Sequence, residues 1–296
     1  MGEAMRDPSF VGRLPEGYEV ESGPPGVLAL SREFAPALRG AGYGLESDGA
    51  ARRSALSGRK PLLELTTSAG VFLVRRFAHG GLLRFLTRER YRDPSRPFRE
   101  LSLSCSLARA GVGTPAVAAA RARPAPGWGW NLEIVTQRVE GAFDLDEALA
   151  LAASGRIDRS ALRRAVAAAG RLVRALHGAG CRHADLTTKN MLVERVLPRG
   201  GDPRTWILDL DGASLVPGLT DAERRSSLTR LFRYVLRRER RRGPALARTD
   251  WARFLRAYEP DRQRRRAHAR AILASHARSL PWHGLGWKLE ELLAPK

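Results

Sequence analysis

The sequence predicts an α+β protein with two lobes, a small β-rich N-terminal lobe and a mainly helical C-terminal lobe. Short apolar runs bounded by turn residues, which are typical of strands, occur at 62–66, 71–77, 117–121 and 130–136. Beyond residue 144, longer segments repeat apolar residues at steps of three and four, which is typical of helices. With 296 residues, the chain is long enough for one two-lobed domain with a sizeable core.

Four segments are expected along the chain. Residues 1–26 are rich in glycine, proline and charge, and we expect a flexible N-terminal segment there. Residues 27–136 should form the N-lobe, beginning with a short edge strand at 27–30. Residues 137–259 should form the C-lobe and carry the catalytic loop, and residues 260–296 a basic helical extension.

Helices are predicted in both lobes. In the N-lobe, residues 96–110 start with Pro97 near the helix N-terminus and continue with a buried apolar stripe. In the C-lobe, helices are expected at 144–153, 160–178, 222–242, 250–258 and 262–277. The second of these should face the core through Leu162, Val166, Ala169, Val173 and Leu176.

The segment 177–212 contains the residue types that phosphoryl transfer from a nucleotide requires. Asp185 and Asn190 lie on one short loop, and Asp209 directly follows an apolar run. In such a trio, one carboxylate orients the attacking hydroxyl and accepts its proton, while the Asn oxygen and the second carboxylate hold magnesium. Each residue alone has an ordinary interpretation, as a capping Asp or a strand-end turn residue. Their order along the chain favours the phosphotransferase hypothesis.

Nucleotide-binding candidates occur in the N-lobe. Arg75 ends an apolar strand, where nucleotide kinases carry a phosphate-binding Lys, and Glu100 is its candidate partner. A solvent-exposed Arg and a first-turn Glu are the ordinary alternatives. Gly58 belongs to a small-residue turn that would let backbone N–H groups approach a phosphate, but no GxGxxG motif is present, and these positions alone favour an ordinary turn. Gln137 and Val139 lie in the predicted crossing between lobes, where backbone groups would receive an adenine.

The net charge of +20 comes almost entirely from arginine, since the chain has only four lysines. Residues 221–278 hold 18 Arg against 6 Asp and Glu. Such a surface favours polyanions: nucleic acid, an anionic membrane or an acidic substrate. The compositional bias of a GC-rich genome is the alternative. The segment 79–91 is basic and amphipathic, which suits either a lipid surface or a packed connecting helix.

Other classes of protein are not expected. Cys105 and Cys181 have no metal-ligand spacing and are expected to be free thiols in a reducing compartment. No apolar run is long enough to cross a bilayer, and the N-terminus has no apolar signal region. The arginine runs contain few aromatic residues and no recognised nucleic-acid-binding motif, so no nucleic-acid partner is expected.

Several motifs together resemble the lipopolysaccharide core kinases, and most closely the 3-deoxy-D-manno-octulosonic acid (Kdo) kinases. The matching segments lie at 73–83, 88–91, 98–101, 110–115, 183–192 and 207–211, with a weaker match at 227–233. The resemblance covers residues 50–240. It implies an atypical protein-kinase-like fold that uses ATP and Mg²⁺.

The resemblance also implies roles for individual residues. Asp185 would be the catalytic base, Asn190 and Asp209 the magnesium ligands, and Arg75 with Glu100 the pair that clamps the phosphates. The candidate substrate residues are His183, Lys189 and Asp211. Lys189 stands where Kdo kinases tend to have His, so the sugar contacts are expected to differ. Asp211 is also a second candidate for the metal, and the loop at 57–60 lacks a second glycine.

The activity that the resemblance implies is phosphorylation of Kdo on Kdo-lipid A, at the 4-hydroxyl, in lipopolysaccharide inner-core biosynthesis. The implied partners are ATP, the anionic glycolipid and an anionic membrane surface, which places the protein peripherally on the cytoplasmic side of the bacterial inner membrane. One alternative is a kinase of the same fold that acts on a heptose, a small molecule or a protein. Another is an inactive, arginine-rich scaffold or nucleic-acid-binding protein.

Overall fold

The computed structural model describes residues 8–54, 62–78, 90–195 and 201–275. The chain forms two compact units. The first consists of Met1–Glu140 together with Leu210–Ala213, and the second of Gly141–Asp209 together with Ser214–Lys296. The predicted N-lobe ends at residue 136, whereas the first unit continues to Glu140.

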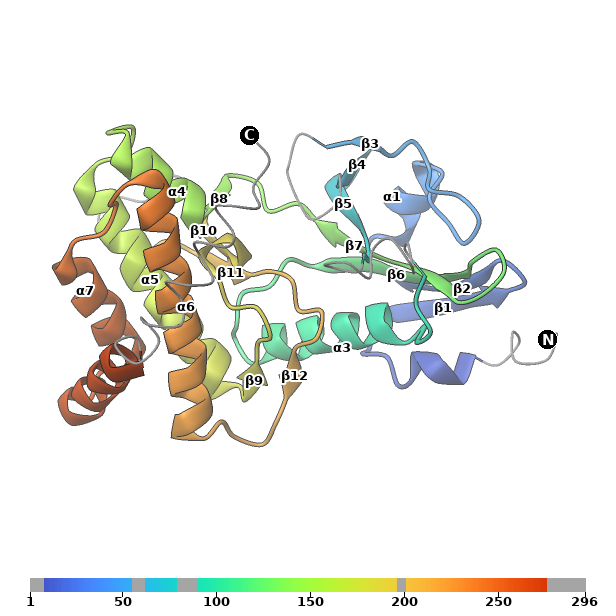
Figure 1. Ribbon diagram of the computed structural model, residues 1–296. Helices are drawn as coiled ribbons and strands as arrows, with labels where there is room; N and C mark the ends of the chain where they lie inside the picture. Colours follow the sequence, from blue (N-terminus) through green and yellow to red (C-terminus); the bar gives the residue numbers. More distant parts are fainter. Residues whose placement is uncertain (1–7, 55–61, 79–89, 196–200, 276–296) are drawn as a thin grey trace. The chain divides into compact units, whose positions relative to one another are not determined.

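The first unit is built on a seven-stranded antiparallel sheet with the strand order β1-β2-β6-β7-β5-β4-β3 (Figure 1). Its strands are β1 (Tyr18–Gly23), β2 (Gly26–Ser31), β3 (Arg52–Arg53), β4 (Leu63–Thr67), β5 (Gly70–Arg76), β6 (Val117–Pro124) and β7 (Trp130–Gln137). The predicted strands at 62–77 and 117–136 are therefore two neighbouring hairpins of one sheet.

Both faces of this sheet are covered. Helix α3 (Arg96–Arg109) packs on one face, where Phe98 and Leu101 join a core cluster with Ile134. Helix α1 (Ala35–Gly40) packs on the other face, where a second cluster contains Leu38 and Phe72. Because side chains alternate between the two faces of a strand, burial of both faces explains why β2 reads as a continuous apolar run.

Two predictions for the N-terminal region are wrong. The flexible segment expected at 1–26 includes a 3₁₀ helix at Pro8–Val11 and strand β1. The strand expected at the edge is β2, which pairs with β1 on one side and β6 on the other. The cause is that β1 is itself the edge strand, and an edge strand tolerates the charged residues that made it look like a loop.

Gly26, with φ of 138°, allows the hairpin to pass close to the carbonyl of Ala122.

The second unit is mainly helical (Figure 1). Its helices are α4 (Leu145–Ala153), α5 (Arg159–Gly178), α6 (Asp221–Arg242), α7 (Arg248–Tyr258) and a further helix over 262–275. A three-stranded sheet contains β8 (Ala142–Asp144), β10 (Met191–Glu194) and β11 (Thr205–Ile207) in the order β11-β10-β8. A short pair consists of β9 (Cys181–Arg182) and β12 (Ser214–Leu215).

Helix α5 is the core helix of this unit. The five apolar residues predicted to face the core are all buried. Gly170 lies against the backbone of α7, where a Cβ would meet the carbonyl oxygen of Phe254 at 2.5 Å, so the close approach of these two helices requires glycine. The side chain of Asp158 caps the N-terminus of α5 by accepting the Ala161 N–H at 2.6 Å.

Within the described part of the chain, no helix has both the length and the apolar character that crossing a membrane requires.

Candidate active site

The predicted catalytic residues lie on two connected segments of the second unit. Asp185 lies in the loop between β9 and a short 3₁₀ helix, Thr188–Asn190, which Asn190 ends. Asp209 comes shortly after β11. Strands β10 and β11 are antiparallel, with Met191 opposite Ile207, so the residue before β10 lies beside the residue after β11. The Leu208 N–H accordingly donates to the Asn190 carbonyl at 2.8 Å, which places Asp209 next to Asn190.

The side chain of Asn190 ties the loop together. Its Nδ2 donates to the backbone carbonyl of Asp185 at 2.7 Å. Because the amide nitrogen is engaged as the donor, Oδ1 is the acceptor atom that remains available. An amide oxygen beside a carboxylate is suitable chemistry for Mg²⁺.

His183 connects the two segments and is buried, with 5% of its surface exposed. Its Nδ1 accepts the Asp185 N–H at 3.2 Å, which leaves Nε2 protonated to donate to the Leu208 carbonyl at 3.0 Å. Desolvation lowers the pKa of His183, which favours this neutral tautomer. Both ring nitrogens are therefore used inside the protein, and the geometry favours a positioning role over direct contact with substrate.

Asp209 has an unusual backbone conformation. Its φ is 56°, and it is the only residue other than glycine with positive φ in the described ranges. Asp tolerates the left-handed region better than most residues, and backbone strain of this kind is concentrated at functional sites. This conformation turns the backbone directly after Leu208. Because the Leu208 N–H bonds to the Asn190 carbonyl, Asp209 comes immediately after that contact.

Asp211, the second metal candidate, belongs to the first unit and has a different partner. Both of its carboxylate oxygens accept from Nη2 of Arg96 at 2.8 Å. The guanidinium carbon of Arg96 also lies 4.8 Å from the centre of the Tyr91 ring. This bidentate pair occupies the Asp211 carboxylate.

Helix α6 holds the catalytic loop on both sides of Asp185, directly on one side and through Asp146 of α4 on the other. Before Asp185, Nη1 of Arg230 donates to the carbonyls of His183 and Ala184. After it, the Thr188 hydroxyl donates to the buried carboxylate of Asp146 at 3.3 Å. That carboxylate also accepts from Nε of Arg238 at 3.1 Å. The loop is thus attached to a long helix rather than held by its own residues alone.

This attachment was not predicted from the sequence, because the arginines of α6 were expected to form a basic surface. Arg238 is nevertheless buried, and it follows the buried Leu231 and Val235 by seven and three residues. This spacing places all three on one face of the helix, and it was the available signal. Arg242 also pairs with Asp146, at 2.7 Å, although it is exposed.

The predicted ion pair of the first unit is present. Nη2 of Arg75, on β5, lies 2.5 Å from the carboxylate of Glu100, on α3, and Glu100 is buried. The guanidinium carbon of Arg75 also lies 4.7 Å from the centre of the Phe77 ring. The Glu100 carboxylate and the Phe77 ring together orient the Arg75 guanidinium.

The remaining candidates are more scattered. Gln137 ends β7, and its amide donates to the Ala69 carbonyl at 3.4 Å, while Val139 is half-buried just beyond the strand. Lys189 is exposed. Gly58 and most of the basic segment 79–91 lie outside the described residues.

Few side chains of the site could hold a metal ion. No group of three or more His, Cys, Asp or Glu residues suited to a metal occurs in the part of the chain that the structure describes. Magnesium in kinases takes one or two protein oxygens and completes its octahedron with phosphates and water. Asn190 and Asp209 match that limited ligand set.

Comparisons with known proteins identify the family and the fold. Residues 50–258 match the model of the lipopolysaccharide kinase (Kdo/WaaP) family. A 3-deoxy-D-manno-octulosonic acid kinase of Actinobacillus succinogenes is 30% identical over 190 residues, which cover 63% of this chain and 74% of that protein. A protein of the same name from Stenotrophomonas maltophilia is 28% identical over 195 residues, covering 64% and 72%.

A solved structure supports the fold. The structure of WaaP in complex with acyl carrier protein aligns with a TM-score of 0.51 and 24% identity, covering 83% of this chain and 90% of that one. The fold is therefore kinase-like, as predicted. The chain belongs to the lipopolysaccharide kinase (Kdo/WaaP) family and is a phosphotransferase that acts on a hydroxyl acceptor.

Proposed function

We propose that this lipopolysaccharide kinase transfers the γ-phosphoryl group of ATP to the 4-hydroxyl of Kdo on Kdo-lipid A. The observation that carries the proposal is the bond from Asn190 to the Asp185 carbonyl, beside the strained Asp209. The relatives named as Kdo kinases supply the identity of the acceptor.

Asp185 is proposed as the catalytic base. Its backbone is held from three directions, by His183, Asn190 and, through the preceding carbonyl, Arg230. A carboxylate on such a fixed backbone orients the acceptor hydroxyl for in-line attack and accepts its proton as the new P–O bond forms. Most of the rate enhancement in phosphoryl transfer comes from such positioning and from neutralisation of charge.

Nucleotide binding is assigned to residues of the first unit. Arg75, oriented by Glu100, would donate to the phosphate oxygens, and a permanent guanidinium charge suits that purpose. Backbone groups near Gln137 and Val139 would receive the adenine, and Gly58 would allow close approach of a phosphate. Asn190 and Asp209 would hold Mg²⁺, which neutralises negative charge on the phosphates when it is bound.

The acceptor is proposed to approach from an anionic membrane surface, with the enzyme bound peripherally on the cytoplasmic side of the inner membrane. Lys189 is an exposed cation one residue from Asn190, so it is the first candidate for contact with the Kdo carboxylate. Asp211 is tied to Arg96, and a contact between Asp211 and the sugar stays a prediction.

The test is transfer of label from γ-labelled ATP to Kdo-lipid A by the purified protein. We expect one phosphate per Kdo-lipid A, dependence on Mg²⁺, and loss of at least about a thousandfold in rate with Asp185→Asn. Asp202→Asn is the matched control, because Asp202 is an exposed carboxylate whose partner is the exposed Arg171.

The result also separates the acceptor from the chemistry. Label transfer to a heptose-containing or small-molecule acceptor but not to Kdo-lipid A would overturn the acceptor while leaving the kinase activity in place. Undiminished transfer by Asp185→Asn would overturn the assigned base. Flotation with anionic vesicles, compared with neutral ones, tests the membrane contact.

A further inference from the structure

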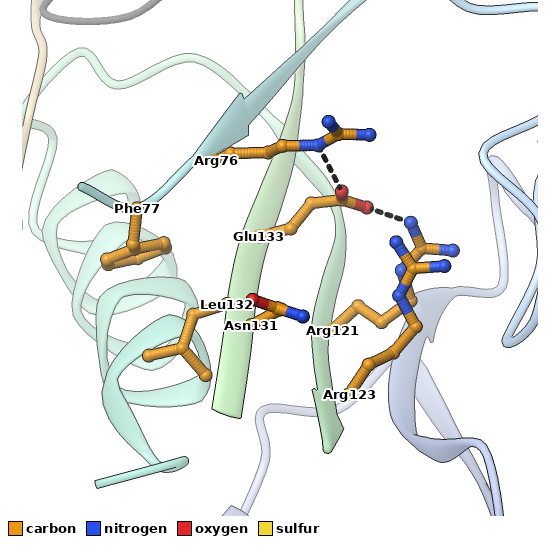
Figure 2. Close-up of a pocket in the computed structure, with 7 residues that line it drawn as sticks. All are labelled: Arg76, Phe77, Arg121, Arg123, Asn131, Leu132 and Glu133. Carbon is orange, nitrogen blue, oxygen red and sulfur yellow. Dashed lines mark ion pairs between the residues drawn. The ribbon is translucent and has the colours of Figure 1, made fainter. Parts of the chain in front are cut away.

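A basic cavity lies on the sheet of the first unit, where β5 ends and β7 begins. Its volume is about 180 Å³, far above the ~15 Å³ that one water molecule requires. It is lined by Arg76, Phe77, Arg121, Arg123, Asn131, Leu132 and Glu133 (Figure 2).

The charged residues that line the cavity are separate from the Arg75–Glu100 pair, whereas Phe77 of the lining also contacts Arg75. Strand pairing places Glu133 opposite both Arg76 and Arg121, so these three side chains form a row across β5, β7 and β6. Successive side chains of a strand point to opposite faces of the sheet. Arg75 meets Glu100 on the face that α3 covers, and the row that begins with Arg76 therefore lies on the other face.

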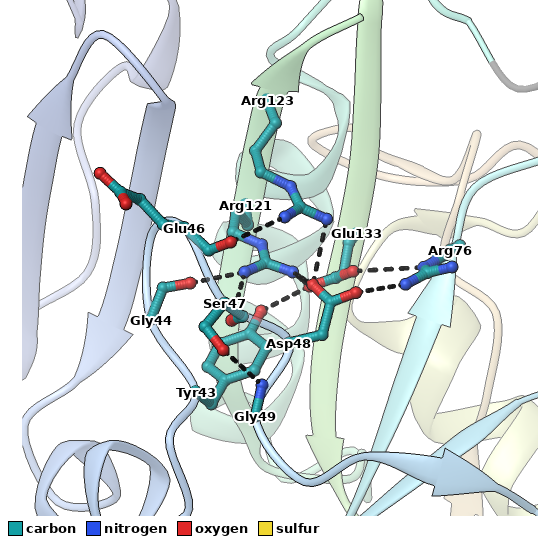
Figure 3. Close-up of polar contacts among 10 residues, drawn as sticks. All are labelled: Tyr43, Gly44, Glu46, Ser47, Asp48, Gly49, Arg76, Arg121, Arg123 and Glu133. Atoms are coloured by element: carbon teal, nitrogen blue, oxygen red, sulfur yellow. Dashed lines mark hydrogen bonds and ion pairs between the residues drawn. The ribbon is translucent and has the colours of Figure 1, made fainter.

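Positive charge exceeds negative charge at this cavity. Within the described residues, the guanidinium groups of Arg76, Arg121 and Arg123 meet only two carboxylates, those of Glu133 and Asp48 (Figure 3). Three cations facing two anions leave one charge uncompensated. Arg76 and Arg123 are also partly exposed, so their remaining N–H groups are accessible to a ligand.

Arg121 supplies an unpartnered donor at the same place. Its side chain is 1% exposed and bonds to the carbonyls of Gly44 and Ser47, at 2.5 Å and 2.8 Å, and to the two carboxylates. Its Nε is buried and has no hydrogen-bond partner. A buried N–H without an acceptor is costly, and native structures rarely leave one unless a ligand or water completes it.

Anchoring of the neighbouring loop accounts for only part of this arrangement. The bonds from Arg121 to Gly44, Ser47 and Asp48 hold the loop against the sheet. They do not require two further arginines, and they do not require a hollow. Exposed Asn131 adds an amide to the lining.

We propose that this cavity is a binding site for a compact oxyanion, a phosphate or phosphate monoester, held by Arg76, Arg121 and Arg123. The planar guanidinium groups of Arg76 and Arg123 match phosphate oxygens in pairs, and the unpartnered Nε of Arg121 adds one donor. The ligand is distinct from a nucleotide phosphate at Arg75, which lies on the opposite face of the sheet. Its source is either a soluble phosphate compound or the headgroup of an anionic lipid.

The first experiment uses the full chain and inorganic phosphate, without ATP or lipid acceptor. Titration at constant ionic strength, followed by calorimetry and by melting temperature, should show saturable binding in the wild type. Arg123→Gln should weaken the apparent affinity about tenfold, as expected for loss of a charge-assisted bond. Arg39→Gln is the control, because Arg39 is an arginine of the same unit that pairs with carboxylates but does not line the cavity.

The second experiment replaces phosphate with phosphatidylcholine vesicles that contain or lack phosphatidic acid. Flotation that needs phosphatidic acid and is weakened by Arg123→Gln, but not by Arg39→Gln, would identify the lipid headgroup as the source. Phosphate binding without such flotation would identify a soluble ligand.

Equal effects of Arg123→Gln and Arg39→Gln in both experiments, or no saturable binding in either, would overturn the site. Neither measurement depends on kinase turnover, so the outcome is independent of the proposed acceptor.

Discussion

Two buried polar networks, one in each unit, use the same residue types in opposite ways. In the first unit, the cation of Arg121 is central, with Asp48 and Glu133 around it. In the second unit, the carboxylate of Asp146 is central, with Arg238 and Arg242 around it. Each network contains a buried donor without a partner, Nε of Arg121 in the first and Nη1 of Arg238 in the second. The first network borders the basic cavity, whereas the carboxylate of the second also accepts from Thr188 of the catalytic loop.

The difference shows what an excess of arginine can do. Where further arginines gather around an already paired arginine, the surplus charge faces a hollow and is available to a ligand. Where two arginines converge on one buried carboxylate, they support the loop that carries Asp185 and Asn190. The same arginine-rich composition therefore serves recognition in one unit and rigidity in the other.

The largest expected effect comes from removing the centre of the second network. Asp146→Ala leaves Arg238 buried without its carboxylate, and we expect a loss of about 3–5 kcal/mol in the free energy of unfolding. Urea denaturation measures it. Asp221→Asn is the control, since its carboxylate on the same unit is exposed and should change stability by less than about 0.5 kcal/mol. A loss below about 1 kcal/mol for Asp146→Ala would show that the network carries little of the stability.

A smaller loss of stability is expected at the edge of the first network. The Tyr43 hydroxyl donates to the Glu133 carboxylate at 2.6 Å, and both residues are buried. Tyr43→Phe removes this bond but leaves Glu133 paired with Arg121. We therefore expect the free energy of unfolding to fall by about 2 kcal/mol, measured by urea denaturation. An unchanged denaturation midpoint would mean that Arg121 alone satisfies Glu133.

The third prediction separates support of the loop from support of the fold. Arg230→Gln removes the donor to the His183 and Ala184 carbonyls, and we expect kcat to fall about tenfold while KM for ATP changes little. Arg225→Gln, on the same helix but outside the loop contacts, should leave both constants unchanged. Arg230→Lys should recover part of kcat, because one ammonium can still donate. If Arg230→Gln and Arg225→Gln raised KM and lowered kcat to the same extent, a positioning role for Arg230 would be contradicted.

The smallest effect is a pH dependence that distinguishes the two units. In the second unit, desolvation lowers the pKa of His177 from 6.5 to about 3, and Arg224 and His268 add to the shift. The unfolded chain then binds more protons than the folded chain between these values. Stability should therefore fall on acidification, by about 1 kcal/mol between pH 7 and pH 5.5.

The Asp48 carboxylate of the first unit contributes no such dependence over that interval. Desolvation alone would raise the pKa of Asp48, but Arg121, Arg123 and Arg76 outweigh it and lower the pKa below 3.8. The stability that Asp48 provides is therefore complete above that value and is lost only at lower pH. His177→Gln should reduce the slope of the profile between pH 7 and 5.5, measured by urea denaturation at each pH, while His183 and His268, whose pKa values desolvation also lowers, keep part of it. An unchanged slope in this variant would assign the effect to other groups.

Much of the architecture follows from local patterns. The apolar stripe of α5, the hairpins of the first unit and the order of Asp185, Asn190 and Asp209 all depend on spacing along the chain. The ion pair of Arg75 with Glu100 was also predictable, because the end of a strand and the start of a helix suggested both partners. The pairing of β1 was not, because its polar residues suit an edge strand and a loop equally well.

What the sequence by itself determined is the set of chemical groups for phosphoryl transfer and the elements that carry them, because periodicity and motif spacing are local properties. Tertiary structure alone decided which arginines became buried partners and which line a hollow. Arg121 and Arg238 look like any other arginine in a chain with a net charge of +20. Only packing shows that Arg121 pairs with Glu133 of the neighbouring strand and that Arg238 pairs with Asp146 of another helix, because these ion pairs form between residues far apart in sequence.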